Sequence, residues 1–140
     1  MSVITIQTLM DKNDIIEELK KTLNKSYSPY SKIKVAAATV FEVDGKEEVV
    51  FGTNIENISY GLTICAERSS IFNARIKGME QVKEIYVMSN LDKPIMPCGA
   101  CRQVISEFAR KPDEVLVYCY NERGEEVKFK FNQLLPNSFK

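Results

Sequence analysis

The sequence predicts a single α/β domain over residues 1–140, a three-layer α/β/α arrangement in which helices cover both faces of a mixed five-stranded sheet. Two patterns predict it: helical and continuous apolar segments alternate in the second half, and a hairpin signal lies in the first half. The length of 140 residues, with 44% hydrophobic and 27% charged residues, suits one globular core. No repeat and no Pro/Gly/Ser-rich linker divides the chain.

The first half contains a predicted helix and a predicted hairpin. Residues 11–25 favour a helix, capped by Asp11 or Asn13, because their apolar side chains fall on one face. Pro29 disfavours helix at the residue before it and so ends the pattern. Two alternating strands joined by a turn signal follow, at residues 33–43, Asp44-Gly45 and 48–54.

The second half alternates helices with buried strands. Each helical segment is followed by a continuous apolar run, which indicates crossover connections and a sheet covered on both faces. A final strand carries alternating lysines, as a charge-protected edge strand does. In chain order we expect a helix over 65–76, a strand over 85–88, a helix over 98–108, a strand over 115–120 and an edge strand over 127–131.

Composition excludes several classes of function. The chain has no histidine, so it can form no Ser-His-Asp triad, no Cys-His pair and no imidazole proton shuttle. Acid–base chemistry near neutral pH must then use another side chain with a shifted pKa, or a metal-bound water. The 19 basic and 19 acidic residues cancel, which argues against a nucleic-acid or anionic-membrane partner.

The location expected from the sequence is the cytoplasm. No segment approaches the roughly 20 apolar residues of a membrane span, and residues 1–10 lack the features of a secretory signal. Thiols stay reduced in the cytoplasm. The four cysteines are therefore expected to be metal ligands, a nucleophile or core residues rather than disulfides.

Three cysteines are spaced for metal binding. Cys98 and Cys101 follow Pro97 and are three residues apart, so their sulfurs share one face at the start of a helix. Cys65 starts the preceding helix, and helix N-termini favour thiolates. We expect the two helix starts at the carboxyl ends of neighbouring parallel strands. Three thiolates are one short of a closed structural zinc site and leave a fourth position for water beside Glu67.

Other interpretations of these residues stay open. A Cys-x-x-Cys pair also occurs in redox sites, and it forms half of closed zinc sites, in which Cys119 would be the fourth ligand. Cys119 lies in an apolar run, however, where a small buried thiol is ordinary. Glu67 taken alone is a solvated helix glutamate, and its spacing from Cys65 is what favours a catalytic role.

Four segments together carry a resemblance to a known family. They read Ser-Pro-Tyr-Ser at 28–31, a stretch over 52–68 that includes Cys-Ala-Glu-Arg, Pro-Cys-Gly-Ala-Cys-Arg-Gln at 97–103, and Leu-Leu-Pro-Asn-Ser-Phe at 134–139. The chain resembles the small homotetrameric zinc-dependent cytidine deaminases. The match covers nearly the whole chain in the family's order, and it contains the Cys-x-Glu and Pro-Cys-x-x-Cys pattern of zinc deaminases.

The resemblance implies a fold, an activity and a metal. The fold is a mixed five-stranded sheet between helices. The activity is hydrolytic deamination of cytidine and deoxycytidine to uridine and deoxyuridine with release of ammonia, in pyrimidine salvage, by a homotetramer with shared active sites. The metal is one Zn²⁺ per chain on Cys65, Cys98 and Cys101, with Glu67 as the shuttle that moves protons between water and the pyrimidine.

The same resemblance implies roles for further residues. Arg68 donates hydrogen bonds to the zinc-bound thiolates, and Gln103 supports the ligands without touching the metal. Without the surrounding motif, Arg68 is a surface arginine and the Asn54/Glu56 pair a polar strand end. The implied substrate contacts are the ribose hydroxyls for Asn54 and Glu56, the base edge for the Ala66 backbone, and a neighbouring subunit's site for Phe139.

One departure from the family concerns the wall of the substrate site. The family usually carries Phe where this chain has Ile33, which keeps an apolar wall but loses up to about 0.5–1.5 kcal/mol of aromatic stacking. Arg102 is expected as a surface or interface charge and Tyr60 as interface packing. Two rival functions remain open: a zinc deaminase for another aminated heterocycle, and a non-enzymatic zinc domain with Cys119 as fourth ligand.

Overall fold

The computed structural model describes residues 10–139. Their regular elements follow the predicted order, with a short 3₁₀ turn and a short last helix in addition. In chain order they are α2 (Lys12–Leu23), β1 (Val35–Val43), β2 (Lys46–Thr53), η1 (Tyr60–Leu62), α3 (Ala66–Ile76), β3 (Gln81–Ser89), α4 (Gly99–Phe108), β4 (Leu116–Asn121), β5 (Glu126–Lys130) and α5 (Phe131–Leu134).

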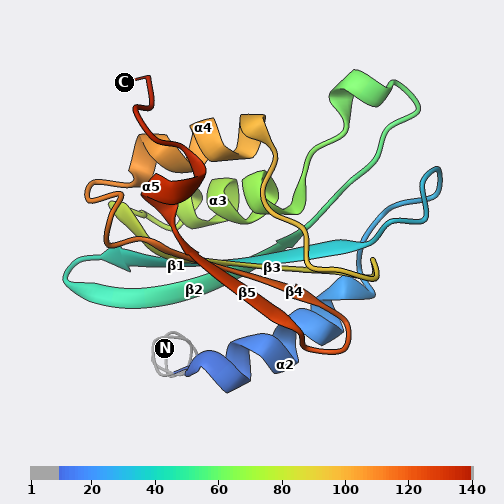
Figure 1. The fold of residues 1–140 in the computed structure, drawn as a ribbon, viewed down its shortest axis with the longest axis horizontal. Helices are drawn as coiled ribbons and strands as arrows, with labels where there is room; N and C mark the ends of the chain where they lie inside the picture. Colours follow the sequence, from blue (N-terminus) through green and yellow to red (C-terminus); the bar gives the residue numbers. More distant parts are fainter. Residues whose placement is uncertain (1–9, 140) are drawn as a thin grey trace.

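The strands form one mixed five-stranded sheet in the order β2-β1-β3-β4-β5. The pair β3/β4 is parallel, and the other three pairs are antiparallel. Helix α2 lies on one face of the sheet, and α3, α4 and α5 lie on the other (Figure 1). This confirms the predicted three-layer α/β/α fold.

The prediction that the helices of the metal site start at the ends of two neighbouring parallel strands is wrong. Helix α3 follows β2 and α4 follows β3, and these two strands run in the same direction, but β1 lies between them. The reason is the hairpin: β2 pairs with one edge of β1, which leaves the other edge of β1 for β3. The two helices still start at the same end of the sheet, one strand further apart than expected.

Several boundaries differ from the predicted ones by about two residues. Asp11 caps α2 and accepts a 2.8 Å hydrogen bond from the Asp14 backbone N–H. Strand β1 starts at Val35 because side chains, described below, hold the residues just before it. Strand β2 starts at Lys46 because Asp44 and Gly45, with φ of 51° and 74°, make a two-residue turn.

Two hydrophobic clusters occupy the two faces of the sheet. Strand β1 contributes Ala36 and Ala38 to the cluster beneath α2, and Ala37 and Phe41 to the cluster beneath α3 and α4, as expected from the alternation of side chains along a strand. At Gly52 a Cβ atom would lie 2.5 Å from the backbone nitrogen of Ser70. Helix α3 therefore packs directly on the β2 backbone, which places the start of α3 tightly against the sheet.

Candidate metal centre

The three predicted ligands meet at the starts of two helices. Cys65 is the N-cap of α3, Cys98 is the N-cap of α4, and neither side chain makes a capping hydrogen bond. Cys101 follows in the first turn of α4. The three sulfur atoms lie within 4.8 Å of one another, with Cys65 Sγ and Cys98 Sγ 3.8 Å apart. Cys101 is fully buried, whereas Cys98 is exposed.

This cluster fits a zinc ion. A tetrahedral site with Zn–S bonds of about 2.3 Å places its sulfurs about 3.8 Å apart. Arg68 lies beside the cluster, with Nη2 3.5 Å from Cys65 Sγ. Its Nε is buried and has no hydrogen-bond partner among residues 10–139. A guanidinium in this position offsets the net negative charge of three thiolates around Zn²⁺.

The thiols influence one another's protonation. A hydrogen bond with Cys101, helped by those from Arg68 and Cys98, lowers the pKa of Cys65 to about 5. The hydrogen bond with Cys65 and burial raise the pKa of Cys101, so Cys65 ionises before Cys101. Because zinc binds thiolates, its binding releases the remaining protons and is favoured by rising pH.

Glu67 lies two residues after Cys65, in the first turn of α3, and is only 5% exposed. Burial, more than any neighbouring charge, raises its pKa to about 7. Its backbone carbonyl accepts a 3.0 Å hydrogen bond from Ser70 Oγ, which lies 2.7 Å from Thr39 Oγ1 on β1. A buried carboxyl whose pKa lies near 7 suits general acid–base catalysis.

Cys119 lies outside the cluster. The group of metal-ligating side chains found over the described part of the chain contains Cys65, Cys98 and Cys101 only. Cys119 is fully buried on β4, and burial raises the pKa of its thiol to about 12. It is a core residue, so the arrangement favours an open three-thiolate site over a closed one.

The side chain of Asn54 holds the segment that precedes β1. Its Oδ1 accepts from Ser26 Oγ at 2.5 Å and from the Val35 N–H at 3.0 Å. Its Nδ2 donates to the Ile33 carbonyl at 2.8 Å. Asn54 is buried, and Ile33 packs against the cluster beneath α3 and α4. The position of Ile33 therefore depends on the Asn54 amide.

Asn90 makes the matching contacts from the opposite side, and the sequence did not single it out. Its Oδ1 accepts from the Lys34 N–H at 3.0 Å, and its Nδ2 donates to the Lys32 carbonyl at 3.0 Å. Asn54 directly follows β2 and Asn90 directly follows β3, the two strands that flank β1. We call these two residues the asparagine clamp. Only the strand order reveals it.

Glu56 binds the loop that carries Tyr30 and Ser31. One carboxylate oxygen accepts from the Tyr30 and Ser31 N–H groups at 2.9 and 3.1 Å, and the other accepts from the Ser31 hydroxyl. These bonds, that of the hydroxyl above all, lower the pKa of Glu56. The predicted strand over 48–54 ends at Asn54, whereas β2 ends at Thr53, so neither Asn54 nor Glu56 lies in a strand.

The remaining predicted residues lie around this site or at its margin. Ala66 is the buried first residue of α3. Phe139 is 85% exposed, and Gln103 donates a 3.1 Å hydrogen bond to its carbonyl. Arg102 was expected as a surface or interface charge. In the structure it is partly buried, and its side chain donates hydrogen bonds to two backbone carbonyls.

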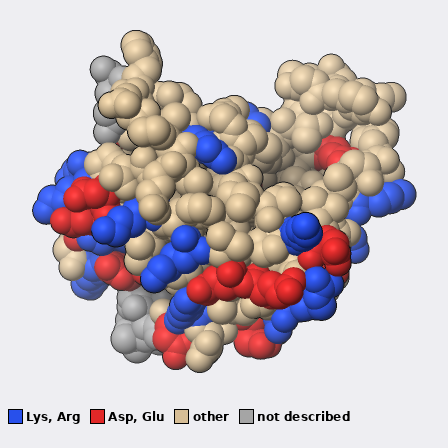
Figure 2. All heavy atoms as spheres, in the orientation of Figure 1, with Lys and Arg blue, Asp and Glu red and all other residues tan. Residues whose placement is uncertain are grey.

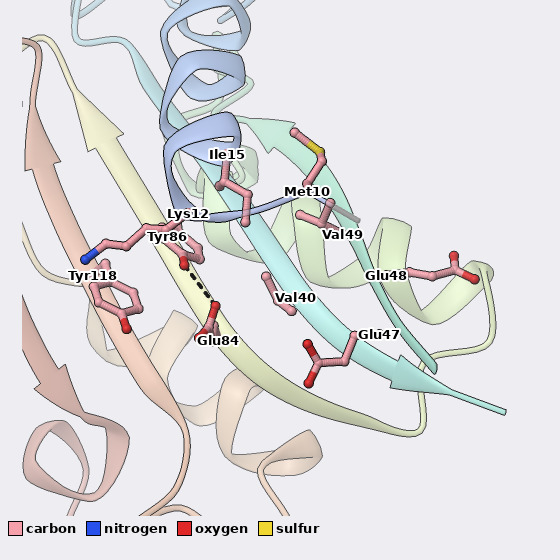
Figure 3. Close-up of a pocket in the computed structure, with 10 residues that line it drawn as sticks. All are labelled: Met10, Lys12, Ile15, Val40, Glu47, Glu48, Val49, Glu84, Tyr86 and Tyr118. Atoms are coloured by element: carbon pink, nitrogen blue, oxygen red, sulfur yellow. Dashed lines mark hydrogen bonds between the residues drawn. The ribbon is translucent and has the colours of Figure 1, made fainter. Parts of the chain in front are cut away.

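A pocket of about 310 Å³ lies on the other side of the sheet, at the start of α2 (Figure 3). It is lined by Lys12, Glu84, Tyr86 and Tyr118 among others, and Tyr86 donates a 2.9 Å hydrogen bond to Glu84. Tyr86 and Tyr118 belong to the hydrophobic cluster beneath α2. The sheet therefore separates this pocket from the cysteine cluster.

Comparison with known families agrees with this geometry. A sequence model described as the cytidine and deoxycytidylate deaminase zinc-binding region matches residues 10–121. The chain belongs to this family. It holds one zinc ion, for which the cysteine cluster provides a fitting site.

Individual relatives match over nearly the full chain. A cytidine deaminase of Halalkalibacterium halodurans is 41% identical over 93% of this chain and 95% of its own length. One of Sporosarcina psychrophila is 41% identical over 93% and 92%. The crystal structure of the cytidine deaminase from Burkholderia pseudomallei superposes with a TM-score of 0.81 at 39% identity, covering 93% of this chain and 100% of that one.

No helix within residues 10–139 combines the length and the apolar character needed to cross a membrane.

Proposed function

We propose that the protein is a zinc-dependent hydrolase that deaminates cytidine and deoxycytidine to uridine and deoxyuridine and releases ammonia. The observation that carries this proposal is the buried Glu67 carboxyl, two residues from Cys65 in a three-thiolate cluster. Full-length relatives named as cytidine deaminases support the choice of substrate.

The chemistry is divided between the metal and Glu67. Zinc bound by Cys65, Cys98 and Cys101 lowers the pKa of a water molecule, so that a nucleophile is available without histidine. The Glu67 carboxylate accepts a proton from the attacking water and delivers it to N3 of the pyrimidine as C4 is attacked. It then carries a second proton to the departing amine. A pKa near 7 allows one carboxyl to both accept and donate.

The substrate side of the site is built around the asparagine clamp. The amide of Asn54 uses one N–H on Ile33 and keeps a second N–H for a ribose hydroxyl. The Glu56 carboxylate, ionised because its pKa is lowered, accepts from another hydroxyl. Ile33 forms an apolar wall for the pyrimidine, and the Ala66 backbone meets the base edge. Gln103 supports the metal ligands without contacting the metal.

We further propose that the protein acts as a homotetramer whose subunits complete one another's sites. Large apolar side chains stay exposed in one chain, with Ile58, Tyr60 and Leu62 at 81%, 78% and 65% and Phe139 at 85%. Figure 2 shows the loop around η1 and the C-terminal segment as projecting lobes with few charges. Exposed apolar side chains on such projecting segments become buried when copies of the chain associate. Phe139 is then positioned to enter a neighbouring subunit's site.

The three thiolate ligands require a reducing compartment, which supports a cytoplasmic role in pyrimidine salvage.

The test is the loss of cytidine absorbance with protein whose zinc content is measured on the same sample. We expect about one zinc per chain and turnover, and Glu67→Gln is expected to keep the zinc and lose nearly all turnover. Glu107→Gln, an exposed position on α4, is the matched control. Equal activity on free cytosine would contradict a nucleoside substrate, and turnover by Glu67→Gln would contradict the proposed proton shuttle.

A further inference from the structure

Arg102 links the loop that carries a metal ligand to the C-terminal segment of the chain. Its Nε donates to the Pro97 carbonyl and its Nη1 to the Leu134 carbonyl, both at 2.7 Å. Pro97 is buried and directly precedes Cys98, and Leu134 is the last residue of α5. One side chain thus satisfies two carbonyls from segments far apart in sequence.

Both carbonyls depend on this contact. A buried backbone carbonyl without a hydrogen-bond partner lowers stability. Pro97 is buried, so its carbonyl needs the bond from Arg102. The carbonyl of Leu134 lies at a helix end, where no intrahelical donor is available. The planar guanidinium reaches both with separate N–H groups in one fixed geometry. Arg102 therefore holds the two segments at a set separation.

Arg102 is one of three side chains on α4 that bind the C-terminal segment. Gln103 donates to the Phe139 carbonyl at 3.1 Å, and Ser106 Oγ lies 3.2 Å from Ser138 Oγ. Of these three, Arg102 is the one that also contacts the Pro97–Cys98 loop. Cys101 directly precedes Arg102 on the same helix, so α4 carries a metal ligand next to the residue that binds the C-terminal segment. Figure 1 shows this segment running beside α4.

The Cys98 ligand has few other constraints. It is exposed, and its side chain makes no capping bond. The Arg102 side chain binds the carbonyl of the Pro97–Cys98 peptide, and the Arg102 backbone N–H donates to the carbonyl of the next peptide, that of Cys98, at 2.9 Å. Loss of the side-chain bond frees the peptide that aims the Cys98 sulfur at the cluster.

We propose that Arg102 is a positioning residue that couples the metal centre to the C-terminal segment, so that zinc binding and ordering of residues 134–139 stabilise each other. The proposal rests on the ligand assignment above and is independent of the substrate. Coupling of this kind is reciprocal: whatever the zinc contributes to the segment, the segment contributes to zinc affinity. Because Phe139 lies in this segment, the coupling also ties presentation of its ring to the metal.

The first measurement is zinc affinity, by competition with a chromogenic chelator. Arg102→Ala is expected to bind zinc about 10- to 100-fold more weakly, the range seen when groups that orient metal ligands are removed. Arg102→Lys keeps the positive charge but lacks the planar guanidinium, so its zinc affinity is expected to lie between those of the parent and of Arg102→Ala. The exposed Arg110→Ala is the control that keeps full zinc affinity. Affinity of Arg102→Ala within twofold of the parent would overturn the proposal.

The second measurement is amide hydrogen exchange in residues 134–139, with and without zinc, at every residue except Pro136, which has no N–H. In the parent, zinc removal by a chelator is expected to cause loss of protection in this segment, whereas the control Arg110→Ala with zinc bound is expected to keep it. Unchanged protection in the zinc-free parent would overturn the coupling even if Arg102→Ala fails to fold. Neither readout uses turnover, so failure to deaminate cytidine would leave this result standing and contradict the proposed function alone.

Discussion

The hydroxyl oxygens of Thr39 and Ser70 lie 2.7 Å apart between β1 and α3, and both residues are fully buried. Ser70 also donates to the Glu67 carbonyl at 3.0 Å. A chain of two hydroxyls therefore runs from strand β1 to the backbone carbonyl of Glu67, the residue proposed as the proton shuttle. Strand β1, which separates the strands preceding α3 and α4, thereby supports the first turn of α3.

This pair leads to a prediction about stability. Ser70→Ala leaves the Thr39 hydroxyl buried without its partner, so the free energy of unfolding is expected to fall by about 1–3 kcal/mol. The double variant Thr39→Val/Ser70→Ala removes both polar groups and is expected to recover part of that loss. Urea denaturation of the zinc-loaded protein measures both, with the exposed Ser59→Ala as control. A double variant no more stable than Ser70→Ala would contradict the proposed pairing.

The asparagine clamp predicts an effect on substrate binding. Asn90→Ala removes both side-chain bonds to residues 32–34 and lets Ile33 move, so kcat/KM is expected to fall, by up to about 100-fold for a displacement near 1 Å. The loss should appear mainly in KM, since the clamp is separate from Glu67 and the cysteines. Steady-state kinetics on cytidine measure it, and the exposed Asn132→Ala is the control. A lower melting temperature with unchanged KM would mean that Asn90 is structural only.

Glu56 predicts a pH dependence of the loop over residues 28–32. Its pKa is lowered in the folded chain, chiefly by the Ser31 hydroxyl. The contact therefore contributes its full stabilisation above the unfolded pKa, near 4.5, and loses it as pH falls through the lower folded value. Ser31→Ala is expected to move the pKa of Glu56 upward and to bring that loss to higher pH. An NMR titration of the Glu56 carboxyl measures the shift, and a downward or absent shift would contradict the assignment.

Cys119 separates an open zinc site from a closed one. Cys119→Ser is expected to retain one zinc per chain, since its thiol is buried in the core outside the cluster, while Cys65→Ser is expected to lose zinc. Elemental analysis of the purified variants measures both. Loss of zinc from folded Cys119→Ser would restore the non-enzymatic zinc domain as the better interpretation.

Local spacing was enough to predict much of this protein. Cys98 and Cys101 are three residues apart, about one helical turn, so the helix itself makes their side chains neighbours. The helices, the strands, the hairpin at Asp44-Gly45 and the buried Cys119 follow from periodicity over a few residues. These properties depend on backbone geometry within one element, which is the same wherever that element lies.

Contacts between distant segments required the folded chain. Asn90 and Asn54 form a clamp only because β1 lies between the strands that precede them, and strand order follows from how whole surfaces pack. Arg102 was expected as a surface or interface charge because local spacing does not reveal its bond to the carbonyl of Leu134, 32 residues further along the chain. Burial of Glu67 likewise arises from packing of α3 on the sheet, and it is this burial that sets the pKa on which the proposed chemistry depends.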